Sequence, residues 1–137
     1  MILQVGVKIF LENPEGKYLL LHRNLEKYKG IRGTWDIAGG RINPGDTLME
    51  NLCREVKEET RLEIVGEPRL LYAQDILRGD PPEKHVVRLT YIGKTNGDPV
   101  LDQAENYEYR WVTRAELETI DDLDIYVKEI IEKKILD

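Results

Sequence analysis

The stretch Gly39–Leu62, GGRINPGDTLMENLCREVKEETRL, holds more structural information than any other part of the chain. It opens with a Gly-Gly pair and closes with the acidic run Arg54–Glu59 (REVKEE). A helix places positions i, i+3 and i+4 on one side, so the carboxylates of Glu55, Glu58 and Glu59 become neighbours. Because like charges repel at this spacing, the pattern favours cations between the carboxylates.

The same stretch predicts a helix over residues 47–60 that begins with a capping-box pair, Thr47 and Glu50. Its core-facing stripe consists of Leu48, Leu52 and Val56. Glu59 continues this apolar stripe, and a carboxylate turned toward the interior costs several kcal/mol unless something pairs with it. Mg²⁺ prefers oxygen ligands and is the simplest compensating charge. We interpret the segment as a divalent-metal site that holds a diphosphate.

Two simpler interpretations stay open at this point. Most helices rich in Glu and Lys only present a solvated charged face. The pair Gly39 and Gly40 is also compatible with an ordinary tight turn. In the functional interpretation, the turn instead brings a backbone carbonyl against the metal, where a side chain would obstruct.

Composition limits the class of protein. The chain has 137 residues, of which 41% are hydrophobic and 34% charged, so we expect one globular domain over residues 1–137. The net charge of −6 argues against binding to a nucleic-acid polymer but leaves a nucleotide substrate open. A single cysteine, Cys53, fits a reducing cytoplasm. The N-terminus lacks signal-peptide features, and no apolar run reaches the ~18 residues that span a bilayer, so we expect a cytoplasmic protein without membrane partners.

Strand-prone segments alternate with turn signals along the chain, which predicts a mixed sheet covered by helices on both faces. A hairpin is expected around the turn at residues 13–16, and loops at residues 24–33 and 78–82. Thr113 and Glu116 predict a short capped helix. The expected strands are Val5–Leu11, Tyr18–His22, Thr34–Ala38 (ending at the Gly-Gly turn), Glu63–Ile76, His85–Lys94 and Tyr107–Val112, and the expected last helix is Ile125–Leu136.

The central stretch resembles the Nudix box, whose pattern is G-x5-E-x7-R-E-U-x-E-E-x-G-U with U apolar. The match covers 23 of 137 residues and runs through Gly40, Asp46, Arg54, Glu55, Val56, Glu58, Glu59 and Leu62. Two positions depart from the pattern. Asp46 replaces the usual Glu and is one methylene shorter, which weakens a supporting contact. Arg61 replaces the usual Gly, where a left-handed backbone just past the helix end costs a non-Gly residue roughly 1 kcal/mol.

Flanking segments extend the resemblance. Gly33–Gly40 looks like the strand before the box, with Ala38 in place of a frequent Pro. Tyr109–Val112, followed by Glu116 and Leu117, looks like the late strand and helix of MutT-like members. The resemblance implies a Nudix-type α/β/α sandwich with a mixed central sheet, which hydrolyses a nucleoside diphosphate linked to another moiety.

The resemblance also implies residue roles. Metal ligands would be the carboxylates of Glu55, Glu58 and Glu59 together with the Gly39 carbonyl, while Arg54 would orient Glu55 through charge-assisted hydrogen bonds. A glutamate before the late strand often supplies a further ligand or the general base. The candidates for it are Glu105 first and Glu108 second, and either is equally compatible with an ordinary surface acid.

Metal-assisted attack of water on phosphorus is the expected chemistry, with two or three Mg²⁺ ions, or Mn²⁺ as a substitute. Arg23, Arg32 and Arg41 lie near the glycine pair in sequence and could hold phosphates, although each also fits a surface charge. Trp35 and Tyr72 could stack on a base, although core packing is the commoner role of strand aromatics. We interpret His22 and His85 as structural.

Several functions remain open. The short chain favours a MutT-like (deoxy)nucleoside triphosphate pyrophosphohydrolase over hydrolases of nucleotide sugars, ADP-ribose or dinucleoside polyphosphates. A nucleotide sensor that does not cleave, or a structural protein with a calcium-binding acidic helix, are alternatives from other classes. The intact acidic set argues against the sensor, and the lack of EF-hand spacing argues against the calcium protein. A homodimer is possible.

Overall fold

The computed structural model describes residues 1–30, 32–79, 81 and 83–137. In these residues a seven-stranded mixed sheet lies between helices. The strands are β1 Ile2–Glu12, β2 Tyr18–Arg23, β3 Trp35–Asp36, β4 Ala38–Arg41, β5 Ile64–Arg78, β6 Lys84–Thr95 and β7 Asn106–Val112. The helices are α1 Leu48–Thr60, α2 Arg114–Leu117 and α3 Ile125–Glu132.

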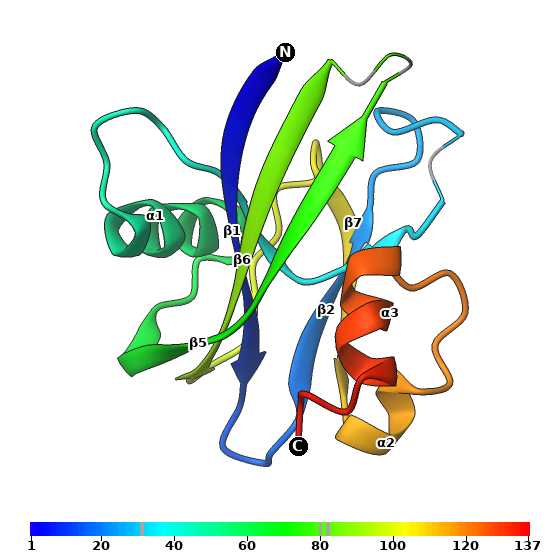
Figure 1. The fold of residues 1–137 in the computed structure, drawn as a ribbon. Helices are drawn as coiled ribbons and strands as arrows, with labels where there is room; N and C mark the ends of the chain where they lie inside the picture. The colour runs from blue at the N-terminus through cyan, green and yellow to red at the C-terminus, as the bar shows by residue number, and fades with distance from the viewer. Residues whose placement is uncertain (31, 80, 82) are drawn as a thin grey trace.

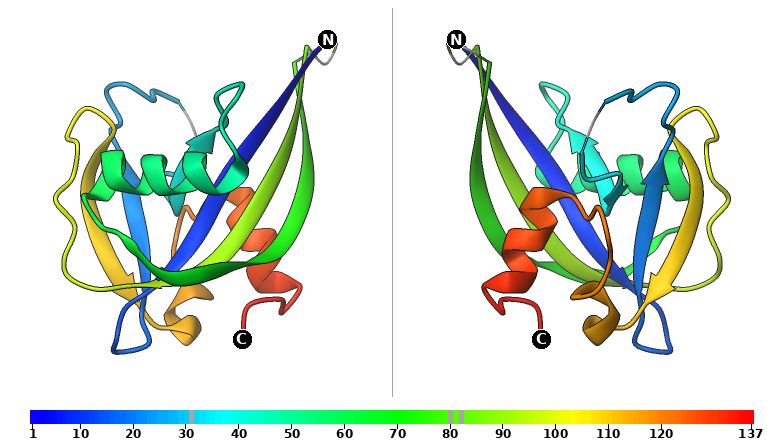
Figure 2. Two further views of the ribbon diagram at one scale, coloured as in Figure 1. Left: turned by 90° about the vertical axis from the view of Figure 1, so that its left-hand side faces the viewer. Right: turned by 90° about the vertical axis from the view of Figure 1, so that its right-hand side faces the viewer.

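The sheet follows the order β3-β2-β1-β6-β5, with β4 added against β1 and β7 added against β2. The pairing of β1 with β6 is parallel, whereas the other strand pairs are antiparallel. Helix α1 covers one face, and α2 and α3 cover the other, as both views in Figure 2 show. The predicted α/β/α arrangement with a mixed sheet is confirmed.

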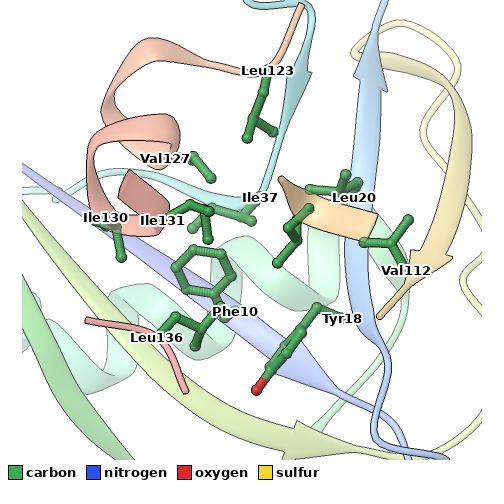
Figure 3. Close-up of a cluster of buried hydrophobic side chains, with 11 residues drawn as sticks. Phe10, Tyr18, Leu20, Ile37, Val112, Leu123, Val127, Ile130, Ile131 and Leu136 are labelled. Carbon is green, nitrogen blue, oxygen red and sulfur yellow. The ribbon is translucent and has the colours of Figure 1, made fainter. Parts of the chain in front are cut away.

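Each face of the sheet has its own apolar core. Under α1, the predicted stripe packs as expected, because Leu52 and Val56 are fully buried against β1 and β2. On the other face, Phe10 from β1 packs among the side chains of α2, α3 and the segment after α3 (Figure 3). The two cores fix α1 and the start of α3 on opposite faces of β1.

Helix α1 is bounded largely as predicted. The hydroxyl of Thr47 accepts the backbone N–H of Glu50 at 3.1 Å, which satisfies one of the free N–H groups of the first turn. The complete capping box is instead formed at α2 by Thr113 and Glu116. At the other end of α1, Arg61 has φ 62° and donates its N–H to the Lys57 carbonyl at 2.9 Å. The predicted left-handed residue is therefore present.

Three local predictions need correction. The expected hairpin forms only next to its turn, where β1 and β2 share the pair Glu12–Tyr18. Beyond that pair the two strands diverge, and β1 pairs with β6 while β2 pairs with β7. Gly39 and Gly40 do not form a turn after a strand but lie inside β4, opposite Lys8 and Val7 of β1. The strand expected at residues 34–38 is divided at residue 37 into β3 and β4.

The last helix ends four residues earlier than expected, at Glu132. Lys134 adopts φ 56°, and the N–H groups of Lys134 and Ile135 donate to the carbonyls of Ile131 and Ile130. This Schellman arrangement reverses the chain and returns Leu136 to the core. The apolar pattern in the sequence therefore continued past the end of the helix, because Leu136 is buried although it lies after the turn that ends α3.

The two long strands expected at residues 63–76 and 85–94 are present as β5 and β6, and they pair over a long antiparallel ladder. The loop predicted between them includes Asp80 and Pro82, and the loop predicted at residues 24–33 includes Ile31; these three positions lie outside the described residues. No helix in the described part of the chain combines the length and apolar character that crossing a membrane requires.

Candidate active site

A cleft of about 560 Å³ lies between α1, β4 and the loops that precede β3 and β7. Its acidic wall is formed by Glu55, Glu58 and Glu59 of α1. Gly39 and Gly40 of β4 line it opposite these acids. Basic side chains also line it, namely Lys8, Arg23, Arg41 and Arg78. Acids and bases from distant parts of the sequence therefore share one concave surface.

The glycine pair allows α1 to approach the sheet closely. A Cβ atom on Gly40 would lie 2.6 Å from the Glu55 carboxylate carbon, so the carboxylate is seated against bare backbone. Gly39 has φ 144°, and a Cβ there would lie 2.0 Å from the Val7 carbonyl oxygen. The Gly39 N–H donates to Oε1 of Glu59 at 2.9 Å. Gly39 therefore has to be glycine, because its Cβ would collide with backbone, whereas a side chain at Gly40 would displace the Glu55 carboxylate.

The electrostatics of the two inner acids follow from this packing. Burial raises the pKa of Glu59 to about 7, opposed mainly by the charge of Lys8 and by the hydrogen bond from Gly39. Burial also raises the pKa of Glu55, opposed mainly by Arg54. Two carboxylates whose charged forms are destabilised by burial constitute a site that favours an additional cation.

Arg54 connects the acidic side chains. Its Nη1 lies 3.3 Å from Oε1 of Glu55 and 3.4 Å from Oε1 of Glu58. The Nε atom of Arg54 lies 3.8 Å from Asp46 and is buried without a hydrogen-bond partner among the described residues. Asn51, fully buried in α1, accepts from Arg54 and donates to the Arg41 carbonyl at 3.0 Å. Arg54 therefore occupies a position suited to orienting Glu55 and Glu58.

The donor set suits a hard divalent cation. Its oxygen atoms come from carboxylates, and Gly40 supplies a cradle that any side chain would fill. In the described part of the chain, no three His, Cys, Asp or Glu side chains are already gathered as a metal-ligand group. Glu58 remains largely solvent-exposed, with 59% of its side-chain surface accessible. Chemistry and packing thus fit a metal, while the carboxylates are held by Arg54 and Gly39.

The two late glutamates are separated by the structure. Glu105 lines the cleft, and its carboxylate is bound by Lys27 and Tyr28 from the loop after β2. These contacts lower its pKa, the hydrogen bond from Lys27 contributing most. Glu108 points elsewhere and lies 3.2 Å from Nδ1 of His22. Of the two candidates, Glu105 alone lines the cleft.

The predicted substrate-binding residues are also divided. Arg41 is exposed at the cleft, while Arg23 lines it but contacts Asp36 and lies 3.4 Å from Asp124. Tyr72 does not line the cleft: it packs against the α3 core, and its hydroxyl lies 3.3 Å from Glu129. We therefore correct the base-stacking role considered for Tyr72, because its ring packs against the core on the α3 side of the sheet.

Other residues considered in the sequence have structural surroundings. Trp35 stacks on His22, with ring centroids 4.4 Å apart, and does not line the cleft. His85 lies 2.7 Å from the carboxylate of Asp75 near the end of the β5–β6 ladder. Arg32 is exposed. None of these contacts brings a further catalytic group to the acidic wall.

Sequence reasoning missed a buried ionic network beside the cleft. Asp36 is buried, accepts from Lys8 at 2.9 Å and contacts Arg23, and Arg88 lies 4.0 Å from it. Arg88 also pairs with buried Asp124 at 3.0 Å. The signal was present as a lysine inside the apolar run VGVKIFL and an aspartate inside WDIAGG. Such single charges in strands indicate buried pairing, but their partners are distant in sequence.

Asn106 is a second residue that the sequence did not reveal. It is buried at the start of β7, and its Nδ2 lies 3.4 Å from Oε2 of Glu59. The amide therefore approaches the carboxylate oxygen that Gly39 leaves free. No local pattern around residue 106 indicates this contact.

Comparison with known proteins agrees with this geometry. The NUDIX domain family model matches residues 2–133. The chain is 31% identical to the nucleoside triphosphatase NudI of Enterobacter sp. (strain 638), over 77% of this chain and 79% of that protein. It is 30% identical to the human 8-oxo-dGDP phosphatase NUDT18, over 84% of this chain but only 33% of that protein. The chain thus spans about a third of the human relative.

Solved structures share the fold. The MutT protein of Methanosarcina mazei Go1 superposes with a TM-score of 0.78 at 28% identity, covering 96% of this chain and 91% of that one. The MutT NUDIX hydrolase of Burkholderia pseudomallei superposes with a TM-score of 0.79, covering 96% and 98% of the two chains; its 19% identity supports the fold alone. With the domain match over nearly its whole length, the chain belongs to the Nudix family of pyrophosphohydrolases, enzymes that are typically metal-dependent and act on nucleotide-type small molecules.

Proposed function

We propose that this protein is a metal-dependent hydrolase of the diphosphate bond in a nucleoside diphosphate linked to another moiety, and specifically a MutT-like (deoxy)nucleoside triphosphate pyrophosphohydrolase. The observation that carries the proposal is the seating of Glu55 and Glu59 against Gly40 and Gly39, in a cleft that also presents basic side chains. The similarity to a nucleoside triphosphatase over most of both chains supports the triphosphate substrate.

The proposed cofactor is Mg²⁺, with Mn²⁺ as a substitute. Glu55, Glu58 and Glu59 would hold it, with the Gly39 carbonyl as a further ligand, and Glu105 would serve either as one more ligand or as the general base. When bound, such an ion neutralises phosphate oxygens and lowers the pKa of water from ~15.7 toward neutrality. Oxygen donors, and carboxylates whose charge is disfavoured by burial, support this assignment.

The protein side chains have distinct proposed tasks. Arg54 orients Glu55 and Glu58 by charge-assisted hydrogen bonds. Arg41 is exposed at the cleft and suits bidentate binding of a phosphate. Arg23 adds positive charge to the cleft wall while it remains paired with Asp36. Glu105 is the proposed general base, and it has to leave Lys27 and Tyr28 before it accepts a proton.

The decisive experiment is a substrate panel with Mg²⁺ and with Mn²⁺, followed by identification of the products. Pyrophosphate plus a nucleoside monophosphate identifies a triphosphate pyrophosphohydrolase. Two monophosphates, each with its own organic group, identify a nucleotide-linked substrate instead. Nucleotide binding without hydrolysis across the panel would replace the proposal by a sensor function.

Site variants test the assigned roles. We expect Glu58→Gln and Glu59→Gln to lower kcat by roughly 100-fold or more, because each removes a charged oxygen donor from the reaction centre. Glu63→Gln is the matched control, since Glu63 lies just beyond α1 and its carboxylate pairs with exposed Lys57 at 3.4 Å. Unchanged turnover in the two site variants would refute the roles given to Glu58 and Glu59.

A further inference from the structure

Lys8 is a basic residue of the cleft to which the proposed mechanism gives no task. It lies in β1 opposite Gly39, and only 14% of its side-chain surface is accessible. Its Nζ donates to Oδ2 of Asp36 at 2.9 Å and to the Ile37 carbonyl at 3.2 Å. Both acceptors belong to the segment that leads into β4. Lys8 therefore places a fixed positive charge at the floor of the cleft.

The stem of Lys8 also contacts the glycine segment. A Cβ on Gly39 would lie 2.9 Å from Cδ of Lys8, so the methylene chain runs directly along this backbone. Gly39 is the residue whose N–H holds Glu59. The ammonium, the glycine backbone and the Glu59 carboxylate are thus neighbours across three elements, β1, β4 and α1.

Glu59 differs from the other two acids of α1 in its basic neighbours. Arg54 contacts Glu55 and Glu58, and within the described ranges no Lys or Arg nitrogen lies within 4.0 Å of the Glu59 carboxylate. Lys8 lines the same cleft as Glu55 and Glu59, and its stem lies against Gly39, whose N–H holds Glu59. Lys8 is therefore placed to stabilise these acids through space, without occupying their oxygen atoms.

We propose that Lys8 is an internal counter-cation of the acidic wall: it stabilises Glu59 and Glu55 beside the glycine segment before a divalent ion binds, and it repels that ion once bound. Lys8 is therefore a positioning residue that sets how tightly the site holds its metal. The inference rests on the proposed metal-dependent function.

The direction in which removal of Lys8 changes metal affinity distinguishes this role from a purely structural role, in which Lys8 only holds the glycine segment in place. If Lys8 only braces the glycine segment, its removal loosens Gly39 and Glu59 and weakens metal binding. If it is a counter-cation, its removal takes a positive charge away from the ion and tightens metal binding. Because the cleft is open to water, the repulsion that is removed is screened by a dielectric constant of about 80, and for charges roughly 6–12 Å apart its loss makes the expected gain about three- to ten-fold.

The test is calorimetric titration of the full-length protein with Mn²⁺ in the absence of nucleotide. We expect Lys8→Met and Lys8→Gln to bind Mn²⁺ about three- to ten-fold more tightly than the wild type. Lys8→Gln keeps an amide that can donate to Asp36, and so retains part of the brace. Lys8→Arg keeps the charge and should bind within about two-fold of the wild type. Lys57→Met, which removes an exposed charge from α1, should leave the affinity unchanged.

A measurement on the wild type makes the test independent of how the variants fold. The ammonium ¹H–¹⁵N resonance of Lys8 should shift during titration with Mg²⁺, whereas that of Lys57 should not. Equal or weaker Mn²⁺ binding in both neutral variants, or an unmoved Lys8 resonance in a protein that binds Mg²⁺, overturns the counter-cation role alone. A wild type that binds neither ion overturns the proposed function, and this inference with it.

Discussion

The side chain of Asp46 is one methylene shorter than Glu and does not reach a hydrogen-bond distance from Arg54. The sequence revealed the substitution, since Asp stands where the family pattern has Glu, and the structure gives its consequence in distances. Oδ2 of Asp46 stops 3.8 Å from Nε of Arg54, which is buried without a hydrogen-bond partner in the part of the chain that is described. A donor in this state has neither water nor a protein acceptor, which disfavours the folded state.

Asp46→Glu should close this gap. We expect the free energy of unfolding to increase, because the longer carboxylate reaches Nε and pairs it. Urea denaturation of the metal-free protein measures the change. Asp121→Glu lengthens an exposed acid elsewhere and should leave stability unaltered. Equal gains in the two variants would show that the Arg54 gap is not the cause.

Asp122 gives a residue-level prediction on pH. Its carboxylate accepts the N–H of Gly33 at 2.7 Å and the hydroxyl and N–H of Thr34 at 2.7 and 3.2 Å. These bonds, led by that of Gly33, lower the pKa of Asp122 below its ordinary value of 3.8. Since the folded state holds the proton less tightly than the unfolded state, the stabilisation is complete above pH 3.8 and is lost as the pH falls below it.

Asp122→Asn tests this sign, and asparagine also tolerates the local φ of 58°. At pH 7 the variant should be less stable than the wild type by about 1 kcal/mol or less, because the site is largely solvent-exposed. At pH 3 the difference should shrink. Asp121→Asn serves as the control, and chemical denaturation at both pH values provides the measurement. A difference that grows at low pH would contradict the assignment.

Among the elements, α1 was the most predictable and the sheet the least. The helix is specified locally: its cap, its stripe of Leu52 and Val56 and its left-handed end at Arg61 all lie within fourteen residues of Thr47. The strands were located from composition, but their neighbours were not. The pairing of Lys8 with Gly39 and with Thr90 joins distant segments, and periodicity carries no information about such partners.

The residues of the candidate site also divide into those that local sequence predicts and those that depend on how distant segments pack. Glu55, Glu58 and Glu59 could be predicted because one helix presents them, and Glu105 because the family resemblance indicated its loop. Asn106 could not be predicted, because its contact with Glu59 depends on where β7 lies relative to α1. The choice between stacking on a base and core packing was left open for Tyr72, because an aromatic residue in a strand gives the same sequence pattern whether it faces a ligand or a core.

The end of α1 yields a prediction at the level of the element. Arg61 adopts φ 62°, a conformation that costs a residue with a Cβ roughly 1 kcal/mol relative to glycine. Arg61→Gly should therefore raise the free energy of unfolding by up to about 1 kcal/mol. Lys57→Gly, placed in the interior of the same helix, should lower it by a similar amount. Thermal and urea unfolding report both changes, and a loss of stability in Arg61→Gly would contradict the strain argument.

Across the whole molecule, a buried ionic network links the cleft to the start of α3 through the sheet. Asp36 joins Lys8 of β1 to Arg23 of β2, and Arg88 of β6 extends the connection to Asp124. Asp124 in turn accepts the N–H groups of Tyr126 and Val127 at 3.0 and 3.1 Å and so caps α3. The cleft beside α1 and the start of α3 therefore depend on one set of charges.

Asp36 is the residue on which this network converges, and its replacement is the most disruptive change that we predict. Burial disfavours its charge, yet Lys8, Arg88 and Arg23 together hold its pKa well below the ordinary value of 3.8. Asp36→Asn keeps the size of the side chain but leaves three cations without their shared partner. We expect a loss of about 3–5 kcal/mol in the free energy of unfolding, as for other buried ion pairs that lose one member.

The matched control is Asp75→Asn, which removes an exposed carboxylate paired with His85 and should cost less than about 1 kcal/mol. Urea denaturation at pH 7 measures both variants, and hydrogen exchange at the N–H groups of Tyr126 and Val127 locates the damage. Because Asp124 caps α3 from within the same network, these two amides should exchange faster in Asp36→Asn even under native conditions. Unchanged protection of α3, together with a cost no greater than that of the control, would show that the charges act separately and that α3 is fixed by its apolar core alone.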